Sequence, residues 1–124
     1  MMELSRRGGA GLTGAIMVVT VFRSRLRDGV DMAALEALGA RMYELASAMP
    51  GFVSYKDFAA QDGELLTLIE FESMDTLAAW RDQPEHRVAQ QRGRDEFFSD
   101  YHIQVCLPSR DYSFDQAGGR RDHR

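Results

Sequence analysis

The sequence is poor in residues that form covalent or metal cross-links. Its one cysteine, Cys106, excludes an intrachain disulfide and any site built from several cysteines. A free thiol is typical of a reducing compartment, so we expect a cytoplasmic protein. No glycine-rich phosphate loop follows a predicted strand, and no close group of His, Asp and Glu resembles a metal site. We therefore expect neither a nucleotide nor a metal.

Positive charge and long apolar runs are also scarce. The chain has 15 Lys and Arg against 19 Asp and Glu, a net charge of −4, whereas nucleic-acid binding needs a positive surface. The longest apolar run, Ala15 to Phe22, is shorter than the ~20 residues of a membrane-spanning helix. We expect no nucleic-acid or membrane partner. The 124 residues predict one domain at 16–113 between flexible tails at 1–15 and 114–124.

The first half predicts a strand followed by a helix. Residues 16–25, IMVVTVFRSR, have the β-branched composition of a strand. Asp31 is a suitable helix N-cap, and Pro50-Gly51 ends the helix because proline cannot continue it. Between these signals, apolar residues recur at spacings of three and four, which indicates one buried helix face: Met32, Leu35, Leu38, Met42, Leu45 and Met49.

The middle of the chain predicts a β-hairpin with apolar residues on both faces. Strands at 52–60 and 65–72 flank Asp62-Gly63, a strong hairpin signal. Regular alternation would place Phe52, Ser54, Lys56 and Phe58 on the helix-covered face with Leu65, Thr67, Ile69 and Phe71. It would turn Val53, Tyr55, Leu66 and Leu68 to the other face. Helices cover only one face, so we predict that a second copy of the chain covers the other, as a homodimer formed sheet to sheet.

The second half predicts two helices and a last strand. Ser73 caps a helix from Met74 to about Arg81, and Pro84 opens another that runs to about Ser99. The strand from Tyr101 onward is broken by Pro108. This order is the split βαβ arrangement of a ferredoxin-like α+β sandwich, an antiparallel sheet with helices on one face.

The segment MPGFVSYKDFAAQDGELLTLIEFESMDTLAAWRDQPEHRVAQ resembles the antibiotic biosynthesis monooxygenase (ABM) domain. The matching features are Pro50-Gly51-Phe52, the run IEFES at the end of the third strand, and Trp80 followed by Pro84-Glu85-His86. The resemblance covers about residues 16–108 and implies a dimeric α/β barrel. Some members of the family oxidise anthrones or quinols with O2 and no cofactor, others cleave haem, and many have no established reaction.

His86 is the first candidate catalytic residue. On a helix that begins at Pro84, it shares one face with Ala89, Gln90, Gly93 and Phe97, whose small and aromatic side chains indicate an inward face. Gly93 weakens a helix by ~1 kcal/mol relative to alanine, so the close approach of a neighbour or ligand would explain it. His86 would act as a base or hydrogen-bond donor to a phenolic substrate. The alternative is a half-buried structural histidine.

The other candidate site residues are one polar and four aromatic side chains. Thr67 lies mid-strand on a face that should be buried, and together with His86 it would orient a carbonyl or hydroxyl. The aromatic candidates are core residues first and walls of a substrate pocket second: Trp80, Phe58, Phe71 and Phe97.

The sequence departs from both active branches of the ABM family. Anthrone-oxidising members carry Asn, Trp and Tyr at positions that pair here with Thr67, Phe71 and Leu77, so their proton-transferring tyrosine has no counterpart. The expected haem ligand of the haem-cleaving members falls on Gln90, one turn past His86. The Gln90 position disfavours haem, and the resemblance implies a cofactor-independent monooxygenase that oxidises a polycyclic phenol, anthrone or quinol with O2. A non-catalytic dimeric module for a small ligand is the alternative, supported by the missing Asn and Tyr, followed by a haem-binding or haem-degrading protein.

Overall fold

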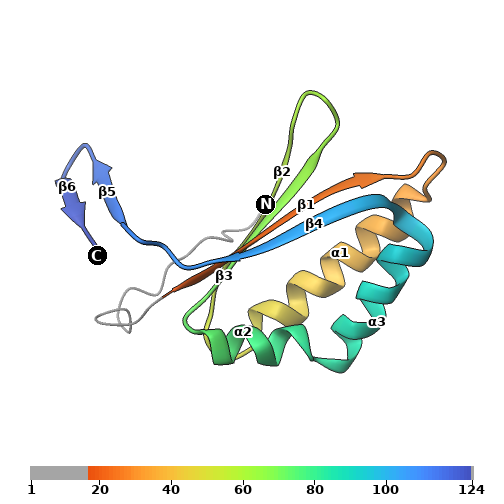
Figure 1. Ribbon diagram of the computed structural model, residues 1–124, viewed down its shortest axis with the longest axis horizontal. Helices are drawn as coiled ribbons and strands as arrows, with labels where there is room; N and C mark the ends of the chain where they lie inside the picture. Colours follow the sequence, from red (N-terminus) through yellow and green to blue (C-terminus); the bar gives the residue numbers. More distant parts are fainter. Residues whose placement is uncertain (1–16, 124) are drawn as a thin grey trace.

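A four-stranded antiparallel sheet carries its helices on one face (Figure 1). The computed structural model describes residues 17–123. Along the chain the elements are β1 (Val18–Leu26), α1 (Met32–Ser47), β2 (Phe52–Ala59), β3 (Leu65–Phe71), α2 (Met74–Arg81), α3 (Pro84–Arg92), the π-helical turn η2 (Gly93–Phe97), β4 (Phe98–Cys106), β5 (Tyr112–Asp115) and β6 (Gly119–Asp122). The strand order β2-β3-β1-β4 confirms the predicted ferredoxin-like fold.

The helices begin where the sequence places their caps. The Asp31 carboxylate accepts a hydrogen bond from the Ala34 N–H at 3.0 Å, and Ser73 forms a reciprocal capping box with Thr76. Pro84 occupies the first turn of α3, where a missing N–H costs nothing. Local chemistry therefore fixes the start of each helix.

The predicted faces of β2 are wrong because the strand contains a bulge. Phe52 pairs with Phe71, but the next register pair is Ser54 with Glu70, so Val53 is an extra residue. One extra residue turns every later side chain to the other face. Ser54, Lys56 and Phe58 consequently lie on the face away from the helices. Tyr55, predicted to face outward, instead packs against the helix-side core.

The core lies between the sheet and the helices. Its buried members come from β1, β3 and all three α-helices: Val18, Met42, Ala46, Phe71, Leu77, Trp80 and Ala89. Phe71 and Ala46 have no exposed surface, and Trp80 is 2% exposed. In this layer α2 packs against β3, and α3 packs against α1 and α2.

The helix α3 ends earlier than predicted. The helix predicted to reach about Ser99 gives way at Gly93 to the π-helical turn η2, and β4 begins at Phe98. A Cβ added to Gly93 would lie 2.8 Å from Cε2 of the Phe98 ring, so the expected close neighbour is this ring. Arg27 closes the junction by donating to the carbonyl oxygens of Phe98 at 3.1 Å, Asp95 at 2.8 Å and Arg94.

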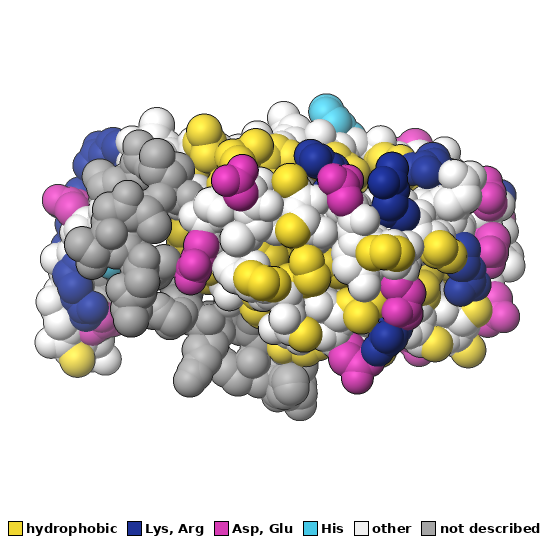
Figure 2. Space-filling view, turned by 90° about the horizontal axis from the view of Figure 1, so that it is seen from below, with side chains coloured by type: hydrophobic (Ala, Val, Ile, Leu, Met, Phe, Trp, Pro, Cys, Tyr) yellow, Lys and Arg dark blue, Asp and Glu magenta, His cyan; other side chains and the backbone are white. Residues whose placement is uncertain are grey.

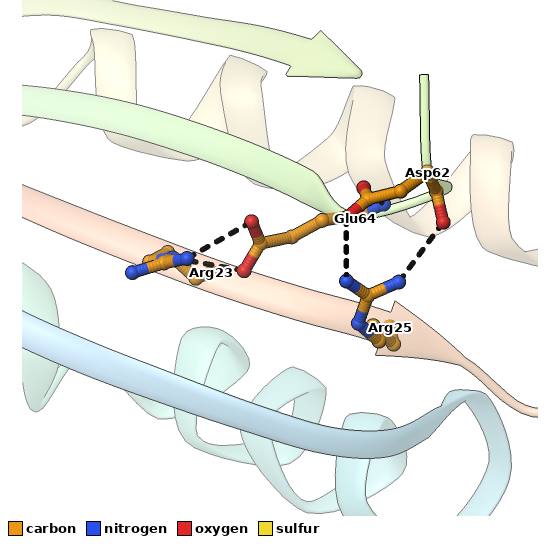
Figure 3. A network of polar contacts seen from close by, with 4 residues as sticks. All are labelled: Arg23, Arg25, Asp62 and Glu64. Carbon is orange, nitrogen blue, oxygen red and sulfur yellow. Dashed lines mark hydrogen bonds and ion pairs between the residues drawn. The ribbon is translucent and has the colours of Figure 1, made fainter. Parts of the chain in front are cut away.

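Two arginines of β1 hold the turn between β2 and β3 on the face away from the helices (Figure 3). Arg23 binds the Glu64 carboxylate in a bidentate pair at 2.8 and 3.0 Å. Arg25 donates to the Asp62 backbone oxygen and carboxylate, both at 3.0 Å. The arginines lower the pKa of Glu64, while that of Asp62 is lowered first by the Glu64 backbone N–H and then by Arg25. These groups are partly exposed, so their main effect is to fix the position of the turn.

The C-terminal segment is a hairpin, although residues 114–124 were predicted to form a flexible tail. β5 and β6 pair antiparallel with each other, and Gly119 takes a φ of 71° at their turn. The predicted tail at 1–15 lies outside the described residues.

Surface charge is mixed on the side that carries the helices. Figure 2 shows this side, where acidic and basic side chains alternate with hydrophobic ones. Among residues 17–123, no helix is long and apolar enough to cross a membrane.

Candidate functional site

His86 and Trp80 form a stacked pair at the junction of α2 and α3. Their ring centroids are 3.8 Å apart and the ring planes differ by 10°. Gln83 sets this geometry, because its side-chain oxygen caps α3 by accepting the His86 backbone N–H at 2.7 Å. Proline at the next position then turns the chain directly into α3. Trp80 and His86, six residues apart in the sequence, are therefore in direct contact.

The hydrogen bonds of His86 define which ring nitrogen is basic. Nδ1 lies 2.9 Å from the Trp80 carbonyl oxygen, and a carbonyl only accepts, so Nδ1 carries the proton. Nε2 then keeps its lone pair and has no hydrogen-bond partner in the described part of the chain. The Gln90 amide donates to the Arg81 carbonyl at 2.9 Å and sits beside Nδ1. The ring is held in the tautomer that a general base requires.

Burial keeps this ring neutral. Desolvation lowers the pKa of His86 below its ordinary 6.5, and the hydrogen bond to the Trp80 carbonyl opposes this only in part. At neutral pH the imidazole is therefore uncharged and able to accept a proton.

Two buried polar groups of the same layer have no hydrogen-bond partner among residues 17–123. They are the Thr20 hydroxyl and the Trp80 indole N–H, on residues that are 8% and 2% exposed. Thr20 follows Val18 on the helix-covered face of β1 and pairs with Ile69, and Val18 and Ile69 both belong to the cluster around Trp80. Buried polar groups are almost always hydrogen-bonded, so two in one layer indicate a place for a missing partner.

Of the other four predicted site residues, one lies in the cluster around Trp80 and three lie elsewhere. Phe71 packs in the cluster around Trp80. Phe97 is buried in the turn η2, under the Arg92 guanidinium, and is not a member of that cluster. Thr67 donates to the Asp57 carboxylate at 2.7 Å across the hairpin. Phe58 lies on the opposite face of the sheet and is 45% exposed.

Sequence reasoning missed two residues of this layer. Thr20 resembles an ordinary β-branched strand residue, and only the structure reveals that its hydroxyl lacks a partner. Tyr55 reaches the core through the bulge, where burial and then the charge of Asp57 raise the pKa of its phenol. Tyr55 therefore stays protonated and can serve as a donor.

No three His, Cys, Asp or Glu side chains gather into a metal-binding group between residues 17 and 123. The Nε2 atom of His86 is a lone-pair nitrogen able to form a single bond to a metal.

Comparisons with known proteins agree with the fold. The profile of the family described as antibiotic biosynthesis monooxygenase matches residues 17–92. The uncharacterized protein YqjZ of Bacillus subtilis is 32% identical over 76 residues, which are 61% of this chain and 67% of that protein. The structure of Rv0793 from Mycobacterium tuberculosis superimposes with a TM-score of 0.69 at 23% identity, covering 78% of this chain and 99% of that one.

Two further solved structures share the fold at lower identity. SnoaB, a cofactor-independent oxygenase from Streptomyces nogalater, has a TM-score of 0.66 at 16% identity, with 77% of this chain and 95% of that chain covered. A dimeric ferredoxin-like protein from Thermobifida fusca has a TM-score of 0.63 at 18% identity, with 76% and 92% covered.

Proposed function

The chain belongs to the antibiotic biosynthesis monooxygenase family, and we propose that it oxidises a polycyclic phenol, anthrone or quinol with O2 and without a cofactor. One observation carries the proposal: two buried donors, the Thr20 hydroxyl and the Trp80 indole N–H, have no partner among residues 17–123, and a neutral histidine, His86, is stacked on Trp80. SnoaB, which shares the fold, is a cofactor-independent oxygenase.

The two donors select the kind of atom that a ligand must present. An indole N–H only donates, and the Thr20 hydroxyl is free to donate as well. A carbonyl or phenolate oxygen can accept from either group, whereas an aliphatic ligand leaves them unpaired. Preorganised hydrogen-bond donors in a site that excludes water stabilise a developing oxyanion. Trp80 and Phe71, which belong to one buried cluster, would contact the rest of the ligand.

His86 supplies the base. Its Nε2 takes a proton from the ring hydroxyl or activated CH2 of the substrate, which leaves a resonance-stabilised anion whose oxygen accepts from Thr20 and Trp80. This anion is electron-rich enough to reduce O2 directly. The carbon–oxygen bond forms as O2 is reduced to a bound hydroperoxide, and the O–O bond then breaks with loss of water. For an anthrone, CH2 and O2 become C=O and H2O, and the proton held by His86 returns in the water.

Oxygen uptake by metal-stripped protein with a panel of anthrones and hydroquinones tests the proposal. We expect uptake above the buffer rate in the wild type and a loss of about tenfold or more in His86→Ala, as is typical for a proton-transfer group. Arg87→Ala, an exposed neighbour on α3, is the matched control and should keep full activity. Uptake that is unchanged in His86→Ala contradicts the role of this residue.

Binding without turnover would identify the alternative function, a non-catalytic module for a small aromatic ligand. The observation that favours it is the Thr67 hydroxyl, which is engaged with Asp57 rather than turned toward His86. Quenching of Trp80 fluorescence by a quinone, with no oxygen uptake across the panel, would support this module and contradict the oxygenase.

A homodimer formed through the sheets is part of the proposal. The face of the sheet away from the helices carries apolar residues that the described helices do not cover: Val19, Val21, Phe58, Leu66 and Leu68. The fold neighbour from Thermobifida fusca is dimeric. The exposed free thiol of Cys106 supports a cytoplasmic location. Sedimentation velocity should give twice the chain mass, and a monomer at micromolar concentration would contradict the dimer.

A further inference from the structure

The C-terminal hairpin β5–β6 stands away from the rest of the molecule. In Figure 1 it lies at the opposite end from α3 and joins the sheet through the chain that leaves β4. Tyr112 and Phe114 share one face of the hairpin, and they are 54% and 73% exposed. An isolated two-stranded hairpin is at best marginally stable in water. Its rings therefore need a surface to cover.

Contacts within the hairpin order its two faces. Two guanidinium groups, those of Arg110 and Arg120, lie over the Tyr112 ring at 5.0 and 4.3 Å. Ser113 bonds the His123 ring at 2.7 Å on the other face. Within residues 110–123, the three arginines at 110, 120 and 121 balance the three aspartates at 111, 115 and 122. A neutral arm with an aromatic face fits an apolar surface better than a charged one.

An uncovered apolar surface of matching kind lies on β4. Tyr101, Ile103 and Val105 pair with Ser24, Phe22 and Thr20 of β1, so they project from the face that the helices cover elsewhere. They are nevertheless exposed, and Ile103 and Val105 each keep 49% of their surface. This β4 stripe borders the candidate site, because Val105 is the register partner of Thr20.

We propose that the β5–β6 hairpin is an arm that docks on the β4 stripe of a second copy of this chain. In Figure 1 the arm lies beyond the end of β4, away from the stripe, so the two surfaces do not cover each other within this molecule. In a two-fold pair each arm covers the partner's stripe, which is the usual symmetry of a homodimer. The arm would then close the side of the partner's site that the edge strand leaves open.

The available apolar surface is sufficient for this contact. With aromatic side chains contributing ~150–250 Å² each, the exposed parts of the arm, the stripe and Leu107 represent roughly 600 Å² a copy, or roughly 1,200 Å² for a symmetric pair. Stable interfaces begin at about 1,200 Å². Two reciprocal arms therefore supply a stable contact, and Leu107, also exposed, continues the apolar track from β4 onto the arm.

Disulfide trapping between full-length chains tests the arm. In a Cys106→Ser background, chains with Phe114→Cys and chains with Ile103→Cys carry different affinity tags and are mixed under mild oxidation. A disulfide requires Cα atoms within about 7 Å, so only docked surfaces react quickly. We expect a mixed disulfide to form at least about tenfold faster than with the control Met74→Cys, a similarly exposed position on α2. Equal rates would overturn the proposal.

Two further experiments distinguish docking on a second copy of this chain from the other possibilities, which are docking on the arm's own chain and docking on a different protein. A chain that carries both cysteines should give a covalent dimer, and an intrachain disulfide would show that the arm folds back on its own stripe. Phe114→Ser should raise the dimer dissociation constant by about tenfold, equivalent to the loss of ~1.4 kcal/mol. The exposed Val88→Ser on α3 should leave it unchanged. An unchanged constant in Phe114→Ser would overturn the proposal in favour of a different protein as partner. None of these readouts depends on oxygenase activity.

Discussion

Thr20→Val separates the folding role of this residue from its proposed binding role. Valine has nearly the shape of threonine and the same branched Cβ, so strand preference and packing change little. The substitution replaces a buried hydroxyl that lacks a partner among residues 17–123 with a methyl group. Because Thr20 is proposed to serve binding rather than folding, replacing it should increase the stability of the protein.

The size of the gain follows from the cost of an unpaired buried group. Leaving a buried hydroxyl without a hydrogen bond costs ~1–3 kcal/mol. We expect Thr20→Val to raise the free energy of unfolding by about 1–2 kcal/mol, because part of that penalty is relieved by relaxation. The same variant should lose at least about tenfold in oxygen uptake, the effect of one missing donor to an oxyanion.

Urea unfolding followed by Trp80 fluorescence measures this gain at a fixed protein concentration. Ser54→Ala is the matched control, because the Ser54 hydroxyl is also buried but donates to the Glu70 carboxylate at 2.7 Å. Its removal should lower the free energy of unfolding by ~1 kcal/mol. If Thr20→Val is destabilised to the same extent as Ser54→Ala, the Thr20 hydroxyl has a partner within the protein and the reasoning fails.

Glycine substitutions and the titration of His86 give two more predictions. Gly93→Ala places a methyl group 2.8 Å from the Phe98 ring, and overpacking of ~1–3 kcal/mol should exceed the ~1 kcal/mol gain in helix propensity. A methyl group added at Gly39 on α1 meets no atom within 4 Å, so the Gly39→Ala protein should be more stable than the wild type. If thermal unfolding shows Gly93→Ala to be more stable than Gly39→Ala, this account of the packing is refuted. Because burial lowers the pKa of His86 below 6.5 in the folded state, the unfolded chain binds more protons below pH 6.5. The contribution of His86 to the free energy of unfolding should be constant above pH 6.5 and fall as the pH decreases through the folded-state pKa. Urea unfolding that gives the wild type and His86→Gln the same pH profile would contradict this.

Local signals predicted most of the fold. The caps at Asp31 and Ser73, the stop at Pro50 and the turn at Asp62-Gly63 depend on residues close in sequence, and the structure has an element boundary at each. The inward face of α3 was also predictable, because helical spacing alone brings His86 and Gly93 together.

Features set by longer-range contacts were not predictable. The bulge at Val53 depends on how β2 meets β3, and it reversed the faces of Ser54, Lys56 and Phe58. Whether Thr20 has a partner depends on what every other element leaves open, which no local pattern records. The C-terminal hairpin did leave a signal, since Tyr112 and Phe114 alternate before a turn that contains Gly119.

Anaerobic titration with an anthrone at pH 7, followed by absorption spectroscopy, tests the proposed site most directly. If the donors of Thr20 and Trp80 stabilise an oxyanion and His86 accepts the proton, the absorption band of the deprotonated ligand should appear on binding, well below the pH at which it appears in buffer. The band should be lost in Thr20→Val and His86→Ala. Binding of the ligand in its protonated form, or an equal band in Thr20→Val, would contradict the assignment of these residues to the site.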